Sequence, residues 1–226
     1  MEAGALVEPL AVGWHAVKMS PMKPGDTVLV LGGGPIGLSL IQALKAKGAG
    51  RVIVSEVAAR RKEYAKEFGA DIIIDPAKED IVERVREITE NVGVDVVWDA
   101  AGVQIGLDTG IQCLRVHGTF LNIAIWEKPC TITPNIITFT ERKYQGVATY
   151  QRGDFEEVLD AISKGLIKPE RMITKKVSCT QGSINPCILT QMQIKLNEIL
   201  EQGFKALIED KANQVKILVD PHSTSS

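Results

Sequence analysis

A run of glycines, GGGPIG, supplies the residue types needed to hold a phosphate group. Gly32, Gly34 and Gly37 have the spacing Gly-x-Gly-x-x-Gly, between an apolar run at 27–31 and an amphipathic segment at 35–47. In such a strand–turn–helix setting, the first glycine permits the tight turn and the second lets a pyrophosphate approach the backbone. The third allows the helix to pack closely on the strand. Free N–H groups at the helix start then bind the phosphates, so the run predicts a dinucleotide site.

An acid follows at the end of the next apolar run. Glu56 lies about 20 residues after the glycines, where a carboxylate accepts hydrogen bonds from the ribose hydroxyls and repels the 2′-phosphate of NADP. Arg61 weakens this preference for NAD, because a nearby guanidinium can bind a 2′-phosphate. A solvated arginine on a helix face is the alternative explanation. The glycine motif alone is weak, and the acid together with the strand–turn–helix setting favours NAD.

Small and polar residues occur where two further strands are expected to end. Asp99-Ala100-Ala101-Gly102 and Leu121-Asn122-Ile123 follow apolar runs, and ligands of doubly wound sheets bind at such ends. Small side chains at 100–102 would admit the ribose and nicotinamide of the cofactor, whereas plain packing explains each residue taken singly. The full set of predicted cofactor-binding residues is Gly32, Gly34, Pro35, Ile36, Gly37, Glu56, Arg61, Ala100, Ala101, Leu121 and Asn122.

These residues need a scaffold that brings the ends of several strands together. From residue 26 onward, short runs rich in Val and Ile alternate with amphipathic segments. This alternation predicts an α/β fold, a doubly wound six-stranded parallel sheet of the Rossmann type with helices on both faces. The expected strands are 27–31, 51–55, 71–75, 93–102, 118–125 and 142–150, and the expected helices are 35–47, 58–69, 79–89, 104–115 and 154–165.

Composition excludes several classes of protein. The formal net charge of −2 gives no electrostatic reason to expect nucleic acid or an anionic membrane as partner. No apolar run is long enough to span a bilayer, and the start lacks the basic region of a secretory signal, so we expect a cytoplasmic protein. The cysteines form no Cys-x-x-Cys pair and the histidines do not cluster with them, which favours reduced thiols over a zinc site within the chain. The cysteines are Cys113, Cys130, Cys179 and Cys187.

The chain resembles the zinc-dependent medium-chain alcohol dehydrogenases, and within them the butanediol and sorbitol dehydrogenase branch, fungal butanediol dehydrogenases in particular. The resemblance rests on GALVEPLAVGWHAV, GDTVLVLGGGPIGL, VIVSEVAARRKEYAKEFGAD, GVDVVWDAAG, GFKALIED and QVKILVD, which together span most of 3–220. It implies that NAD accepts a hydride from a secondary alcohol or diol, which becomes a ketone. It also implies a homodimer formed through the sixth strand, near 143–149, where an exposed strand edge makes pairing physically reasonable.

The family has a catalytic domain before its nucleotide domain, with a cysteine, a histidine and a glutamate as zinc ligands, and this chain lacks that segment. By the Glu-Pro-Leu motif, Glu8 is the one residue expected beside the zinc. One carboxylate cannot hold a catalytic zinc, which needs three protein ligands, so we expect the chain to bind NAD but to be incomplete for catalysis. His15 could relay a proton, but its position on an apolar stripe favours a core residue.

The resemblance divides the chain into three parts. Residues 1–24 would be a remnant that links to the absent catalytic domain, 25–168 the NAD-binding domain, and 169–226 a C-terminal segment that also belongs to the catalytic domain. Residues 177–193 have no clear period and interrupt the family pattern, either as a translated unspliced intron or as a loop insertion. Two alternatives to an incomplete dehydrogenase stay open: a non-catalytic NAD-binding module, and a truncated gene product with an exposed apolar interface.

Overall fold

The computed structural model describes residues 2–176, 199–210 and 212–218. The chain divides into two compact units: Val7–Lys168 forms the larger, and Met1–Leu6 belongs with Pro169–Ser226 in the smaller. The larger unit holds a six-stranded sheet and the smaller a two-stranded sheet. No helix in the described ranges is long and apolar enough to cross a bilayer.

Six parallel strands form the sheet of the larger unit. They are β1 Thr27–Leu31, β2 Arg51–Ser55, β3 Ile72–Ile74, β4 Val94–Asp99, β5 Leu114–Asn122 and β6 Lys143–Gly146. Their order is β3-β2-β1-β4-β5-β6, and every neighbouring pair is parallel. The winding direction reverses between β1 and β4, which confirms the expected doubly wound Rossmann sheet and brings the carboxyl ends of these strands to one edge.

The central strands are buried on both faces because their sequences are almost wholly apolar. Four residues of β1, from Val28 to Leu31, and Val52–Val54 of β2 have at most 3% of their surface exposed. Such continuous runs are typical of parallel strands covered by helices, and they confirm these two strands with the expected ends. The ends of the other strands differ from the prediction. Strand β4 ends at Asp99 rather than at residue 102, β5 runs from Leu114 to Asn122 rather than over 118–125, and β6 ends at Gly146 rather than at residue 150. Strand β3 is shorter by one residue at each end.

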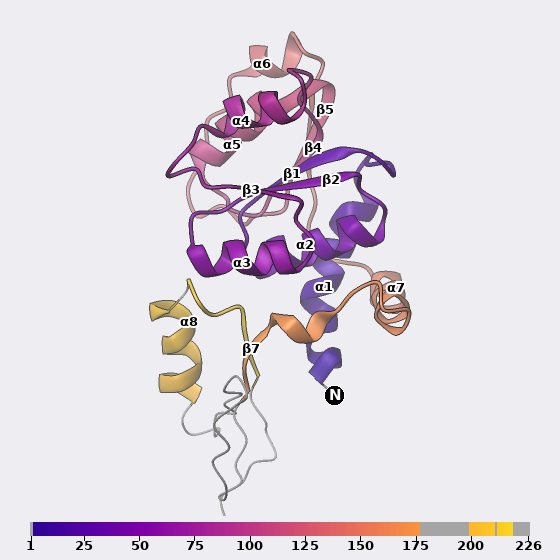
Figure 1. The fold of residues 1–226 in the computed structure, drawn as a ribbon, viewed down its shortest axis with the longest axis vertical. Coiled ribbons are helices and arrows are strands. Elements are labelled where there is room, and N and C mark those ends of the chain that lie inside the picture. Colours follow the sequence, from indigo (N-terminus) through magenta and orange to yellow (C-terminus); the bar gives the residue numbers. More distant parts are fainter. Residues whose placement is uncertain (1, 177–198, 211, 219–226) are drawn as a thin grey trace, which may run out of the picture. The chain divides into compact units, whose positions relative to one another are not determined.

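Helices cover both faces of this sheet (Figure 1). Helices α2 Pro35–Ala46 and α3 Ala59–Glu67 lie on one face, and α4 Ile81–Ile88 and α5 Gln104–Cys113 lie on the other. The core beneath α4 and α5 contains Ile53, Val85, Val97, Leu107 and Phe120. Two further helices are α6 Pro134–Thr138, which the sequence pattern did not indicate, and α7 Arg152–Ser163, which was expected at 154–165.

A long helix precedes the first strand. Helix α1 Glu2–Lys18 covers a region for which we expected no regular element, and it contains Pro9 in its interior. Proline lacks an N–H and ends most helices, which is why the sequence pattern missed α1. Packing offsets this cost, because Leu6, Leu10 and Ala11 are at most 1% exposed. A Cβ atom on Gly13 would lie 2.8 Å from the backbone of Ser39 in α2, so α1 and α2 pack in close contact.

Polar side chains join α1 to α7. His15 is 8% exposed, as expected for a core residue, and its Nδ1 lies 2.7 Å from Oδ2 of the fully buried Asp154. Lys18 donates to both Asp154 and Glu157, and Trp14 Nε1 donates to Glu157 Oε2 at 2.7 Å. We call these five residues the α1–α7 clamp, since they fix α1 against the domain that it precedes.

The smaller unit is described in part. It contains the 3₁₀ helix η1 Pro169–Met172, the π-helix η3 Ile199–Lys205 and the short helix α8 Ala206–Glu209. Its strands, β7 Ile173–Lys176 and β8 Lys216–Leu218, pair in parallel. The proposed insertion at 177–193, together with Cys179, Cys187 and His222, lies outside the described residues.

Candidate nucleotide-binding site

The glycine turn has the geometry that each glycine was expected to provide. Gly32 has φ = 95°, a left-handed conformation that favours glycine, and its N–H donates to Ser55 O at 2.9 Å. A Cβ atom on Gly37 would lie 2.0 Å from Gly32 O, so only glycine lets α2 approach the turn this closely. Gly34 is the N-cap residue of α2, and Pro35 is the first residue of the helix. The first turn of α2 therefore has backbone N–H groups without a partner inside the helix, and these can bind an anion.

Glu56 lies against this turn. Its Oε2 accepts the Gly33 N–H at 2.7 Å, and its Oε1 accepts the Ala58 N–H at 2.8 Å. Glu56 is only 6% exposed, although it lies directly after the last residue of β2. The carboxylate thus holds the glycine turn and the β2–α3 turn together. Each oxygen keeps a further lone pair, which can accept a hydroxyl donor.

The side chain of Arg61, on α3, reaches the glycine turn. A Cβ atom on Gly34 would lie 3.8 Å from an Nη atom of Arg61, which places the guanidinium beside the start of α2. This position suits an anionic phosphate group, whether the pyrophosphate or a 2′-phosphate. The neighbouring Lys62 is engaged elsewhere, since its Nζ donates to Asp75 at 2.5 Å.

The turn after β4 lies next to the glycine turn, and the turn after β5 lies next to the turn after β4. Ala100 N–H donates to Leu31 O at 3.0 Å, and the Cβ of Ala101 lies 3.4 Å from a Cβ built on Gly32. Ala100 is half-buried and Ala101 is exposed, so both can border a ligand. The side chain of Leu121 is fully buried within β5 and borders no surface.

A cavity of about 470 Å³ opens between these two turns. One wall is Ala101–Gln104, and the other is Ile125–Pro129. Trp126, which lines the second wall, donates its Nε1–H to Asn122 Oδ1 at 2.7 Å, and Asn122 in turn donates to Ala124 O at 3.1 Å. Asn122 therefore shapes the cavity indirectly, because it fixes the position of the Trp126 side chain.

Exposed apolar side chains mark the same edge of the sheet, and the sequence pattern did not single them out. Val57 follows β2 and is 61% exposed, Val103 follows β4 and is 47% exposed, and Ile125 follows β5 and is 94% exposed. Aliphatic side chains of this kind are suited to packing against flat rings. They could have been identified from the sequence, because each is an aliphatic residue at or just after the end of a predicted strand.

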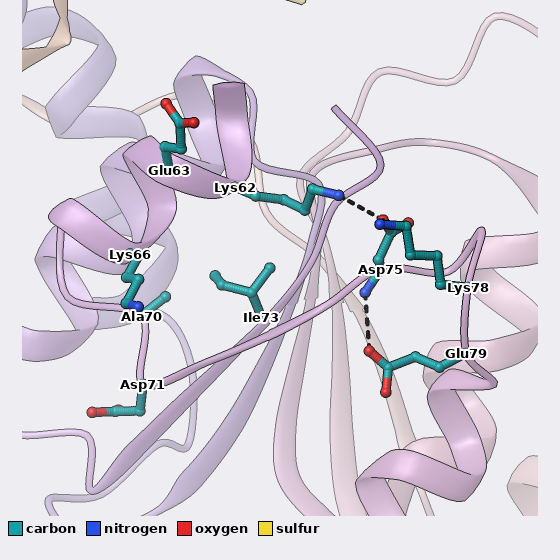
Figure 2. Close-up of a pocket in the computed structure, with 9 residues that line it drawn as sticks. All are labelled: Lys62, Glu63, Lys66, Ala70, Asp71, Ile73, Asp75, Lys78 and Glu79. Carbon is teal, nitrogen blue, oxygen red and sulfur yellow. Dashed lines mark hydrogen bonds and ion pairs between the residues drawn. The ribbon is translucent and has the colours of Figure 1, made fainter. Parts of the chain in front are cut away.

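A second cavity, of about 480 Å³, lies at the outer edge of the sheet (Figure 2). It is formed by α3, β3 and the residues after β3, with Ile73 and Ala70 as its apolar part. Figure 2 shows Lys62 pointing to Asp75 and the Asp75 N–H pointing to Glu79, at 2.5 and 3.4 Å. Lys62 and Lys78 both pair with Asp75. The lining carries three lysines and four carboxylates, so its charges nearly cancel and give no strong selection for a charged ligand.

Comparison with known proteins identifies the family. Residues 35–164, more than half of the chain, match the sequence model of the family described as "Zinc-binding dehydrogenase". The chain belongs to the zinc-binding dehydrogenase family. The matched residues begin at Pro35, at the end of the glycine turn, and contain Gly37, Glu56 and the turns after β4 and β5. Most of the candidate site therefore lies within the matched part.

Relatives of the chain within this family include two named (R,R)-butanediol dehydrogenase. The one from Bacillus subtilis is 41% identical over 98% of this chain and 58% of its own length, and the one from Saccharomyces cerevisiae is 39% identical over 99% and 56%. The crystal structure of 2R,3R-butanediol dehydrogenase from B. subtilis superposes with a TM-score of 0.85, at 40% identity, over 98% of this chain and 58% of that one. The chain therefore spans a little over half the length of these relatives.

A further relative of known structure was solved with a cofactor. An Escherichia coli alcohol dehydrogenase in complex with NADH matches with a TM-score of 0.80 and 26% identity, over 95% of this chain and 58% of that one. The fold of the present chain is thus one on which a dinucleotide has been observed. The residues described above are the ones to test for the same ligand.

The described residues offer few ligands for the zinc that the name of the family implies. Glu8 lies exposed on α1, and no group of three or more His, Cys, Asp or Glu side chains within the described ranges could hold a metal ion. Cys113 is buried, and burial raises the pKa of its thiol to about 12. Cys130 is exposed and free. The described residues therefore do not fit a zinc site.

Proposed function

We propose that this chain binds NAD and serves as the cofactor-binding part of an NAD-dependent oxidoreductase that acts on a secondary alcohol or diol. The observation that carries the proposal is the contact between Glu56 and the glycine turn, since it joins a ribose-binding acid to a phosphate-binding helix start. Loaded with NAD, the site would supply a hydride acceptor, and the chain's own residues would bind and orient it.

Each part of the site suits one part of the cofactor. The pyrophosphate would lie at the start of α2, near Gly34 and Arg61. The adenosine ribose would donate its hydroxyls to Glu56, whose negative charge disfavours a 2′-phosphate, so NAD is preferred over NADP. The nicotinamide half would enter the cavity beside Ala101 and Trp126, where Val103 and Ile125 offer apolar surface to the ring.

The names of the relatives support the substrate class. Butanediol dehydrogenases are 35–41% identical to this chain, and a sorbitol dehydrogenase from B. subtilis is 30% identical over 80% of it. A butanediol-like diol and its ketone are therefore the first substrates to test. Alcohol oxidation in a zinc-binding family uses the metal to lower the pKa of the alcohol, which Glu8 alone cannot support. We accordingly propose that these residues bind NAD but do not turn over alcohol without a separate source of zinc ligands.

The same proposal extends to organisation. Residues 25–168 would form the NAD-binding domain, while 1–24 and 169–226 would belong with a catalytic domain.

Two copies would pair through β6, whose exposed edge has no strand partner on its outer side among the described residues. Sedimentation equilibrium would then give twice the chain mass of 24.6 kDa, and a monomer at all concentrations would contradict the dimer. Free thiols at Cys113 and Cys130 suit a cytoplasmic location.

Fluorescence of NADH tests the proposed function. Titrating the purified chain into NADH should give saturable enhancement of the dinucleotide fluorescence, and excess NAD should reverse it. A non-catalytic NAD-binding module would give the same titration, but it would stay inactive when mixed with the catalytic segment of a butanediol dehydrogenase. A chain that neither melts cooperatively nor binds NADH would instead be a truncated product that does not fold.

A further inference from the structure

Asp99 is a fully buried acid at the carboxyl end of β4. Its residue surface is 0% exposed, in contrast to the half-buried Ala100 and the exposed Ala101 that follow it. In the sheet it lies opposite Leu31 of β1 and Asn122 of β5. The acid therefore lies beneath the point where the turns after β1, β4 and β5 meet.

Two of these turns hydrogen-bond to this one residue. The side-chain Oδ1 accepts the N–H groups of Ala101 at 2.9 Å and Gly102 at 3.0 Å, in the turn after β4. The backbone carbonyl of Asp99 accepts the N–H groups of Ile123 and Ala124, each at 3.0 Å, in the turn after β5. The side chain of Asp99 thus fixes the turn after β4, and the backbone of the same residue fixes the turn after β5.

The turns touch each other at the residue that Asp99 holds. Gly102 has φ = 66°, and a Cβ atom there would lie 3.0 Å from the Cβ of Ala124. These turns lead directly into Val103–Gln104 and Ile125–Pro129, the walls of the 470 Å³ cavity. Freeing the N–H groups of Ala101 and Gly102 would therefore let one wall of the cavity shift.

The surroundings of the second carboxyl oxygen of Asp99 favour the neutral form of the acid. Oδ2 is buried and has no hydrogen-bond partner among the described residues. Burial raises the pKa of Asp99, because a charge there would be desolvated, and the two N–H bonds to Oδ1 oppose this only in part. A neutral acceptor of the same shape should therefore serve as well as the acid.

We propose that Asp99 is a positioning residue of the cofactor site, whose side chain holds the turn after β4 against the turn after β5 in the arrangement that admits the nicotinamide half of the dinucleotide. The inference rests on the proposed function, because it assigns a role toward the bound cofactor. It differs from the roles of the glycine turn and Glu56, since Asp99 contacts only the protein.

Asp99→Asn and Asp99→Ala test the proposal in the full chain, with NADH fluorescence as the readout. Asp99→Asn keeps an oxygen for both N–H groups, so its Kd for NADH should stay within about threefold of the unmodified value. Asp99→Ala leaves both N–H groups without the acceptor and should weaken binding by about tenfold or more. If Asp99→Ala does not melt cooperatively, Asp99→Ser takes its place, with a hydroxyl that reaches the turn less well.

Asp95→Ala is the matched control. Asp95 lies at the amino end of the same strand, where its carboxylate accepts the Thr27 N–H at 2.9 Å and pairs with Arg115 at 2.6 Å. This variant should lower the melting temperature and leave the Kd for NADH unchanged. A loss of affinity equal to that of Asp99→Ala would show that any weakening of β4 suffices, and it would overturn the inference.

The remaining outcomes separate the two proposals. If Asp99→Ala lowers the melting temperature and keeps the unmodified Kd, Asp99 is purely structural and the inference is wrong. If Asp99→Asn loses as much affinity as Asp99→Ala, the neutral-acceptor role is wrong. If the unmodified, folded chain does not bind NADH, the proposed function fails, and this inference fails with it.

Discussion

The Oε2 atom of Glu56 accepts the backbone N–H of Gly33 at 2.7 Å, which joins the end of β2 to the turn after β1. The acid that would bind the ribose and the turn that would bind the phosphates are therefore one hydrogen-bonded unit before any cofactor is present. Such preorganisation lowers the cost of ordering the site on binding.

Glu56→Gln should weaken NAD binding by about 10- to 100-fold, because a hydrogen bond to a charged group contributes about 1.5–3 kcal/mol. The preference for NAD over NADP should fall as well, since the charge that repels a 2′-phosphate is lost and Arg61 stays. Calorimetric titration with each dinucleotide measures both effects. Glu63→Gln, an exposed acid on α3 paired with Arg60, is the control and should change neither. An unchanged Kd in Glu56→Gln would refute the ribose role.

Gly37→Ala should destabilise the domain by about 1–3 kcal/mol and abolish tight dinucleotide binding, because its Cβ would lie 2.0 Å from Gly32 O. Thermal melting and NADH titration measure the two effects. Gly153→Ala, in α7, has nothing within 4 Å of its Cβ and should stabilise by about 0.5–1 kcal/mol without changing affinity. Wild-type stability in Gly37→Ala would mean that α2 does not approach the turn as described.

The α1–α7 clamp should make the domain sensitive to acid through Asp154. Burial acts to raise the pKa of Asp154, but the Gln151 N–H, the Lys18 ammonium and the charge of His15 outweigh it and lower that pKa. A carboxyl group with a lowered pKa stabilises the fold above its ordinary pKa, and this stability is lost as the pH falls through the lowered value.

Asp154→Asn should therefore be less stable than the unmodified chain at neutral pH, by about 1–3 kcal/mol, and the gap should narrow as the pH falls into the acid range. Urea unfolding at a series of pH values measures it. Asp160→Asn, an exposed acid on the same helix paired with Lys164, should show no such gap. A gap that is constant with pH would contradict the assignment to the ionised carboxylate.

Zinc and alcohol should not yield NADH with this chain alone. A catalytic zinc needs about three protein ligands, and the described residues offer Glu8 without a cluster around it. Metal analysis after incubation with zinc and dialysis should find less than one equivalent bound, in both the unmodified chain and Glu8→Gln. Steady formation of NADH from butanediol would show that the chain is complete for catalysis.

The sheet could be predicted from sequence because its strands are short, β-branched and separated by helices of regular period. Runs such as Thr27–Leu31 and Arg51–Ser55 are buried on both faces, so their apolar pattern is continuous and their ends are sharp. The glycine turn could be predicted as well. The positive φ of Gly32 and the close packing at Gly37 both require glycine, so the structural need is visible in the sequence as a glycine motif.

Other features depend on tertiary contacts that no local pattern encodes. No element was predicted over 2–18, and the burial of Leu6 and Leu10 together with the packing of Gly13 against α2 explains why α1 forms there. The bonds from Glu56 to two turns, and from Asp99 to two others, join segments that are distant in sequence. Leu121 was expected at the site because it lies near the end of β5, but both faces of the sheet are covered there, so its side chain is buried like that of its neighbour Phe120.

The central claim is that this chain binds NAD through the glycine turn and Glu56, and calorimetric titration of the purified, folded chain tests it most directly. We expect one-site saturable binding of NAD, and binding of NADP that is at least about tenfold weaker. Cooperative melting together with no heat of binding at millimolar NAD would contradict the claim.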